Sequence, residues 1–117
     1  MPIAGTTPRP EMWADEESGD APPKYEELQT ALDRYDLFSH ARERLLERYR
    51  YNTARAYWGD LDDIFFWCER RELDIFDLND KYLRQYKGLM RRRKYSENTI
   101  RRREVAYRLF RKVVDAD

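Results

Sequence analysis

Cysteine and histidine are almost absent from this chain: its 117 residues include one of each, Cys68 and His40. A lone cysteine forms no intramolecular disulfide, and the two residues together provide too few ligands for a structural zinc site. His40 has no serine or cysteine partner that would indicate nucleophilic catalysis. Cys68 follows Trp67 in an apolar run, so we expect a buried free thiol, which fits a reducing compartment.

Long apolar runs, a signal peptide and glycine-rich loops are also missing. No run approaches the roughly 18 apolar residues of a membrane span, and no signal peptide opens the chain. We therefore expect a cytoplasmic protein with no membrane contact. The four glycines form no phosphate-binding loop, and we predict neither a cofactor nor a bound metal. The acids Asp60, Asp62 and Asp63 could ligate a metal, but we expect them on the solvated face of a helix.

Proline is confined to one end of the chain. All five prolines and two of the four glycines fall within residues 1–23. Residues 1–36 hold nine acidic and three basic residues, whereas residues 37–117 hold 20 basic and 14 acidic ones. We predict a largely disordered acidic leader over residues 1–36 and one folded domain over residues 37–117. The zero net charge by itself favours no nucleic-acid partner, but an acidic leader before a basic domain is found in nucleic-acid-binding proteins.

Apolar residues recur at three- and four-residue spacing from Leu37 onward, and no segment alternates with a period of two. This pattern predicts helices over residues 37–49, from Asn52 to about residue 71, from Asn79 or Asp80 onward, and from Ser96 to about residue 114. Asn52, Asn79 and Ser96 carry side chains that suit a helix N-cap. Residues 24–36 are expected to form only a weak helical turn or two. The predicted fold class is all-α, a small four-helix bundle with short loops.

The last predicted helix has two distinct faces. On a helical wheel its apolar residues gather on one side, while Asn98, Arg101 and Arg102 project from the other side. Arginine makes bidentate contacts with phosphate or guanine, and asparagine makes them with adenine. The free amides of a helix N-terminus also bind phosphate. These residues therefore indicate a nucleic-acid contact, although a solvated charged surface would show the same spacing.

Four consecutive bases, Arg91, Arg92, Arg93 and Lys94, precede Tyr95 just before that helix. Such a run attracts phosphates and helps fix register on a duplex without reading its sequence. The alternative is a solubilising loop, because basic residues are favoured at the C-terminus of the preceding helix. Arg103 falls on the apolar stripe, so it must either extend its charge to the surface or pair with an acid.

The order of key residues over about residues 37–114 resembles a known family. It runs from Asn52–Tyr57 through Leu61, Phe65, Trp67, Leu73, Leu78, Tyr86 and Leu89 to Ser96–Arg102 and Arg108–Phe110. This order resembles the core-binding (SAM-like) domain of tyrosine recombinases, also called phage integrases. Arg103 departs from the pattern, since related domains usually carry an aliphatic residue near this position.

The resemblance implies a domain that clamps duplex DNA for site-specific recombination and DNA integration. In that family a separate catalytic domain carries an Arg–His–Arg set and a nucleophilic tyrosine, so we expect this chain not to be an enzyme and none of its nine tyrosines to be the nucleophile. The implied partners are double-stranded DNA and, in a full-length parent, the catalytic domain and other recombinase subunits. We expect the isolated domain to be a monomer.

The resemblance also implies which residues face the DNA, because two helices of the core-binding domain do so. Together with the basic run, the candidate DNA-binding residues are Asn52, Thr53, Arg55, Arg91, Arg92, Arg93, Lys94, Tyr95, Ser96, Asn98, Thr99, Arg101 and Arg102. Two other functions stay open. A small helical bundle with surface aromatics such as Tyr51 and Phe66 would also suit a protein–protein interaction module, and the acidic leader would suit a regulator that covers the basic face.

Overall fold

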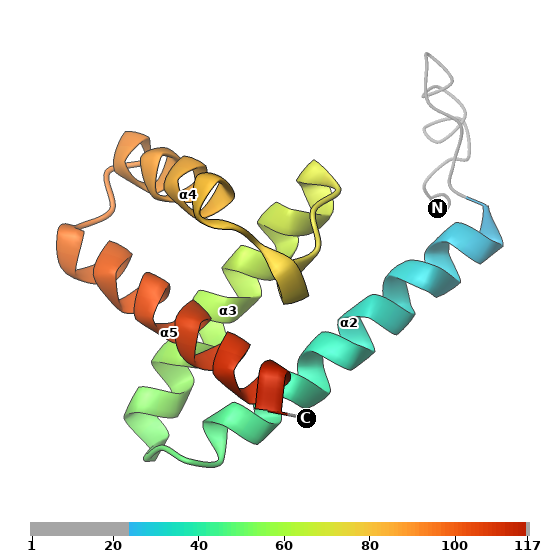
Figure 1. Cartoon of the computed structure of the whole chain (residues 1–117), viewed down its shortest axis with the longest axis horizontal. Coiled ribbons are helices and arrows are strands. Elements are labelled where there is room, and N and C mark those ends of the chain that lie inside the picture. The colour runs from blue at the N-terminus through green and yellow to red at the C-terminus, as the bar shows by residue number, and fades with distance from the viewer. Residues whose placement is uncertain (1–23, 117) are drawn as a thin grey trace, which may run out of the picture. The chain divides into compact units, whose positions relative to one another are not determined.

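The computed structural model describes residues 24–116, and every regular element in this range is a helix (Figure 1). In chain order the elements are α2 (Tyr25–Leu46), α3 (Tyr51–Arg71), the short 3-10 helix η2 (Ile75–Asp77), α4 (Asp80–Arg92) and α5 (Glu97–Ala116). The predicted all-α class with four helices is confirmed for this range. None of the described helices combines the length and the apolar character needed to cross a membrane.

The chain divides between residues 34 and 35 into two units, the second of which is residues 35–117. The second unit contains all of α3, α4 and α5. Residues 1–23 lie outside the described residues, so the disorder expected there stays a prediction. Every feature of the candidate site belongs to the second unit.

The first helix is longer at its N-terminal side than predicted. It begins at Tyr25 and not near residue 37, and it ends at Leu46, after which residues 47–49 form a turn. Glu26 and Glu27 lie in its first turn, where carboxylates interact favourably with the positive end of the helix dipole. The N-terminal part of α2 was predicted as only a turn or two because a helix is recognised from a buried apolar face. Leu28 and Leu32 in this part are 50 % and 64 % exposed.

Two of the three predicted N-caps are confirmed. Asn79 accepts a hydrogen bond from the Tyr82 amide at 3.0 Å, and the Ser96 hydroxyl accepts one from the Thr99 amide at 3.1 Å. The third prediction, Asn52, is wrong because α3 begins one residue earlier, at Tyr51, and its N-cap is Arg50 without a side-chain cap. Asn52 therefore lies within the first turn, with its side chain left for other contacts.

The core of residues 35–117 joins all four helices through aromatic and aliphatic side chains. Helix α5 packs against α3 and α4, and its packing against α3 is the most extensive contact between helices, visible as the crossing in Figure 1. Phe38 of α2 stacks on Phe65 of α3 with ring centroids 4.7 Å apart and meets Phe110 of α5 at 5.6 Å. Burial of such rings is the main stabilising term in a domain of this size.

Tyr107 fixes the connection between α3 and α4. Its hydroxyl donates to the Ile75 carbonyl at 2.7 Å and accepts from the Leu78 amide at 3.0 Å. These backbone groups flank η2 and would otherwise be buried without partners. The Tyr107 side chain of α5 therefore ties this connection to the core.

We predict that Cys68 does not react with thiol reagents in the native protein. Its side chain is 1 % exposed, and burial, followed by the nearby charges of Asp74 and Glu69, raises the pKa of the thiol to about 12. Only the thiolate is nucleophilic. At pH 8, labelling by a chromogenic disulfide should therefore be complete within the mixing time in denaturant and slow in buffer. Equally fast labelling in buffer would contradict the burial of this residue.

Candidate nucleic-acid interface

An open pocket of about 380 Å³ lies between the first half of α3 and the first half of α5. Sequence reasoning placed Asn52, Arg55 and Arg102 in one candidate site although they come from two distant segments, and the structure brings all three to this pocket. The pocket also contains residues that sequence reasoning did not assign to a site, Gly59 among them. The complete lining is Asn52, Arg55, Ala56, Gly59, Asp60, Arg102 and Arg103.

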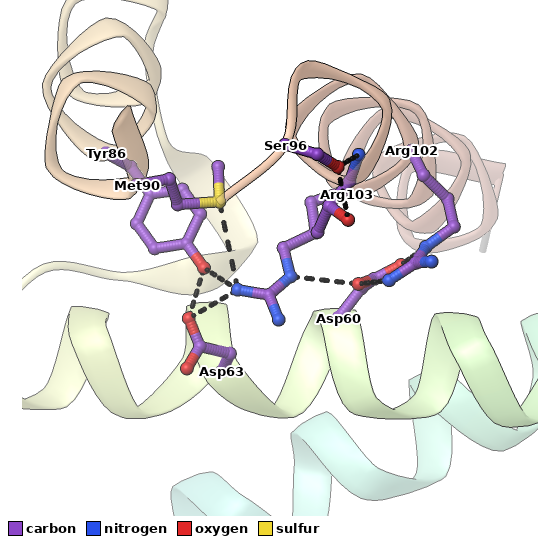
Figure 2. A network of polar contacts seen from close by, with 8 residues as sticks. Asp60, Asp63, Tyr86, Met90, Ser96, Arg102 and Arg103 are labelled. Atoms are coloured by element: carbon purple, nitrogen blue, oxygen red, sulfur yellow. Dashed lines mark hydrogen bonds and ion pairs between the residues drawn. The ribbon is translucent and has the colours of Figure 1, made fainter. Parts of the chain in front are cut away.

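A network of ion pairs forms one wall of the pocket and joins α3, α4 and α5 (Figure 2). Both oxygens of Asp60 accept from Arg102, each at 2.7 Å, and Arg103 Nε adds a third contact at 2.9 Å. Arg103 Nη1 continues to Asp63 at 3.0 Å and to the Tyr86 hydroxyl at 3.1 Å. Asp60 is 1 % exposed, so its charge is stable there only because two guanidinium groups surround it.

The acid group on α3 is therefore not the solvated face that we expected. Asp60 is buried, Asp63 pairs with Arg103 and accepts a hydrogen bond from the Tyr86 hydroxyl, and Asp62 pairs with Arg42 at 3.1 Å. The prediction was wrong because a helical wheel shows which side chains share a face but not which arginines approach from other helices. Among residues 24–116, no group of three or more acidic, histidine or cysteine side chains is arranged to hold a metal ion.

Tyr86 stays protonated within this network. Its burial, and next its hydrogen bond to Asp63, raise the pKa of the phenol above its usual range. The hydroxyl thus donates to Asp63 and accepts from Arg103. Of the two fates considered for Arg103, pairing with an acid is the one observed, and its ring contact with Tyr95 at 4.8 Å covers the guanidinium further.

Arg102 is held in a fixed orientation by Asp60. Its bidentate contact uses Nε and Nη2, so Nη1 takes no part in it. The side chain is 43 % exposed, and the hydrogen bond to Asp60 raises the pKa of Arg102. The residue is thus a permanently charged, partly exposed donor at the edge of the pocket.

Arg42 of α2 is a buried arginine that the sequence did not indicate. It is 2 % exposed and donates to Asp62 at 3.1 Å and to the Tyr35 hydroxyl at 3.2 Å. Its guanidinium lies 4.2 Å from the ring centroid of Trp58 and 4.8 Å from that of Phe38. These contacts are typical cation–π geometry, and they give Arg42 a structural role away from the pocket.

The basic run at the end of α4 divides into one paired and three unpaired residues. Arg91 forms an exposed ion pair with Glu97 at 3.0 Å, and this contact lowers the pKa of Glu97. Arg92, Arg93 and Lys94 are exposed, and their side chains form no hydrogen bond or ion pair with a described residue. These three charges are therefore available to a partner.

The backbone around Lys94 turns the chain sharply from α4 into α5. Lys94 adopts a left-handed conformation with φ of 70°. Its amide donates to the Arg91 carbonyl, and the Tyr95 amide donates to the Met90 carbonyl, at 3.0 and 3.1 Å. This is the hydrogen-bond pattern of a Schellman C-cap, where glycine is the usual residue. Consequently the position of Lys94 is set by the backbone and not by a flexible loop.

The remaining predicted site residues fall into two kinds. Ser96 and Thr99 form the cap of α5, so their hydroxyls already have structural partners. Asn98 accepts from Arg101 Nη1 at 3.1 Å, and both side chains are exposed. Thr53 is exposed in the first turn of α3, and Tyr95 is 38 % exposed beside the basic run.

The helix starts and the basic run lie on one side of the second unit. In Figure 1 the start of α5 and the α4–α5 loop lie at the left, and α3 begins at the lower left. The lining of the pocket independently joins the first halves of α3 and α5. Phosphate groups spaced along a duplex are the kind of ligand that such a spread of guanidinium and ammonium groups binds.

Gly59 carried a signal that sequence reasoning could have used. It follows Asn52, Arg55 and Ala56 at spacings of seven, four and three residues, which places all four on one face of α3. Comparisons of the chain with protein-family models, with curated proteins and with solved structures find no match. Any function must therefore be inferred from the residues and the geometry just described.

Proposed function

We propose that the unit of residues 35–117 binds duplex DNA through the side that carries the pocket and the basic run. The binding is non-catalytic and acts mainly through the phosphate backbone. By resemblance, the role is that of the core-binding domain of a tyrosine recombinase, which holds DNA during site-specific recombination and integration while a catalytic domain carries out the chemistry. Its partners would be duplex DNA, that catalytic domain and other recombinase subunits.

The observation that carries the proposal is a set of exposed bases that no acid of the described chain neutralises. The side chains of Arg55, Arg92, Arg93 and Lys94 have no ion pair or hydrogen bond with a described residue, and the Arg101 side chain bonds only to the neutral Asn98. Elsewhere on these helices many arginines are paired, as Arg42, Arg103 and Arg108 are. Such a group of unpaired bases, at the starts of α3 and α5 and at the end of α4, is typical of the electrostatic footprint of a nucleic-acid-binding surface.

Arg91 and Arg102 are less free than the sequence indicated, because each already has a carboxylate partner. The Arg91–Glu97 pair is exposed to solvent, and exposed ion pairs contribute little to stability. A phosphate can compete for Arg91. Arg102 is different, since releasing it would leave buried Asp60 with Arg103 as its remaining partner.

The salt dependence of binding tests this proposal. Fluorescence anisotropy of a labelled random duplex, titrated with the full chain between about 50 and 200 mM salt, should show log K falling with log salt at a slope of roughly −4 to −5, as expected for about five phosphate contacts. No binding at about 50 mM salt, or an affinity that is independent of salt, would contradict phosphate-directed binding.

The first part of α2 carries exposed apolar side chains, which favour a second candidate function, contact with a partner protein. Tyr25, Leu28 and Leu32 recur at helical spacing and are 75 %, 50 % and 64 % exposed. An exposed apolar stripe on a helix is typical of a surface that packs on another helix. Glu26 and Glu27 beside it would favour a basic partner over DNA.

A further inference from the structure

We propose that the pocket between α3 and α5 binds one phosphate group, with Arg55 and Arg102 as its charged ligands and Gly59 as the position that leaves room for it. In the DNA complex this group would be a phosphodiester of the DNA backbone, and this part of the inference rests on the proposed function. The same chemistry would also accept a free phosphate ion. The pocket would thus fix the register of a duplex at one point, while the basic run contributes more diffuse attraction.

Gly59 is the observation that points to an occupant. It lies in the interior of α3, where glycine lowers the folding equilibrium constant by about fivefold relative to alanine. Packing does not explain it, because a Cβ added at Gly59 would meet no atom within 4 Å. The space that glycine leaves open belongs to the pocket that Gly59 lines. Glycine at such a site is the residue that permits close approach of a ligand.

Arg102 is prepared for such a ligand by its contact with Asp60. The bidentate bond fixes the guanidinium and leaves Nη1 outside that contact. A donor that is already oriented loses less conformational entropy when it binds. Asp60 therefore acts as a positioning residue for the pocket.

The negative charge of Asp60 does not exclude an anion. Its two oxygens already accept three N–H groups, two from Arg102 and one from Arg103. Arg55 adds a further positive charge with no described acidic partner, and Asn52 adds an amide that can donate to phosphate oxygen. The lining contains three guanidinium groups and one carboxylate, so the pocket has a net positive charge and favours an anionic ligand.

The two described glycines, Gly59 and Gly88, give a matched pair of variants. A Cβ at Gly88 of α4 would meet only Arg92 Nη1, at an ordinary 3.6 Å, and Gly88 does not line the pocket. Gly59→Ala and Gly88→Ala should both raise the thermal midpoint, because each removes a mid-helix glycine. Only the Gly59 change should weaken the binding of a short duplex, by several-fold, and Gly59→Leu should weaken it by about tenfold or more because its side chain fills the pocket.

The experiment follows backbone amide NMR signals of the full chain during titration with inorganic phosphate and, separately, with a short random duplex. We expect phosphate to shift the signals of Asn52, Arg55, Gly59 and Arg102, and Gly59→Leu to abolish these shifts. Phosphate shifts at the pocket without any duplex binding would support the phosphate site and refute the DNA function. If Gly59→Leu leaves duplex binding unchanged, the phosphate site is overturned and the DNA function stands. The same conclusion follows if Gly88→Ala weakens duplex binding as much as Gly59→Ala does.

Discussion

Replacing Asp60 by asparagine should lower the free energy of unfolding by about 3–5 kcal/mol, the typical effect of removing one partner from a buried ion pair. The carboxylate is 1 % exposed and accepts from both Arg102 and Arg103. Asparagine keeps the shape but loses the charge, so Arg103, which is 12 % exposed, would depend on Asp63 alone. A domain with a total stability of about 5–15 kcal/mol would be severely weakened by this change.

Chemical denaturation of the parent and the variant measures this effect. Asp115→Asn is the matched control, because Asp115 is 63 % exposed and lies 3.7 Å from Arg111, and exposed pairs contribute about 1 kcal/mol or less. Arg102→Ala should have a smaller effect than Asp60→Asn, since Asp60 would keep Arg103 as a partner. If Asp60→Asn unfolds at the same denaturant concentration as Asp115→Asn, the network does not hold the three helices together.

Replacing Arg92, Arg93 and Lys94 together by alanine should weaken duplex binding by roughly 100-fold at about 50 mM salt and reduce the salt slope by about 3. Each of these side chains is exposed and free of a described partner, so each lost charge removes one phosphate contact. The fold should be unaffected, because the C-cap around Lys94 uses backbone groups only.

The matched control removes the same net charge from other surfaces. Arg70, Arg84 and Lys112 are exposed, have no described partner, and lie at the end of α3, in the middle of α4 and near the end of α5. Their triple alanine variant should keep an affinity and a salt slope close to those of the parent. Equal losses in both triple variants would show that net charge, and not this side of the domain, determines binding.

The helices were predictable because their signals are local. Asn79 and Ser96 cap α4 and α5 as expected, since capping involves a side chain and an amide only three residues apart. Ile100, Tyr107 and Phe110 are buried as their spacing indicated. The start of α2 was missed because Leu28 and Leu32 are helical without being buried, and a buried stripe is what periodicity detects best.

The ion-pair network was not predictable in the same way. Asp60 and Arg103 are 43 positions apart, and each alone looks like a surface charge or a packing defect. They become partners only because α3 and α5 cross in the folded domain. The sequence therefore showed Arg103 as a charged residue on an apolar stripe but did not show which acid pairs with it. The same crossing explains why Arg102, predicted as a free DNA contact, is already paired.

The candidate site contains residues that the sequence predicted and one residue, Gly59, that it did not. Two helix starts and a basic run were assigned from residue chemistry and from resemblance, and the structure places Asn52, Arg55 and Arg102 at one pocket. Gly59 was missed although its spacing from Asn52 was readable, because a glycine offers no chemistry of its own. Its significance follows from the open space beside it, which is a property of the folded chain.

The most direct test of DNA binding by this side of the domain is a backbone amide NMR titration of the full chain with a short random duplex at low salt. The shifts should gather at residues 52–59 and 91–102 and should fade as salt is added, because phosphate contacts are screened. Shifts gathered instead at Tyr25, Leu28 and Leu32 or at the exposed aromatics, or no shifts at all, would contradict the account and favour a protein partner.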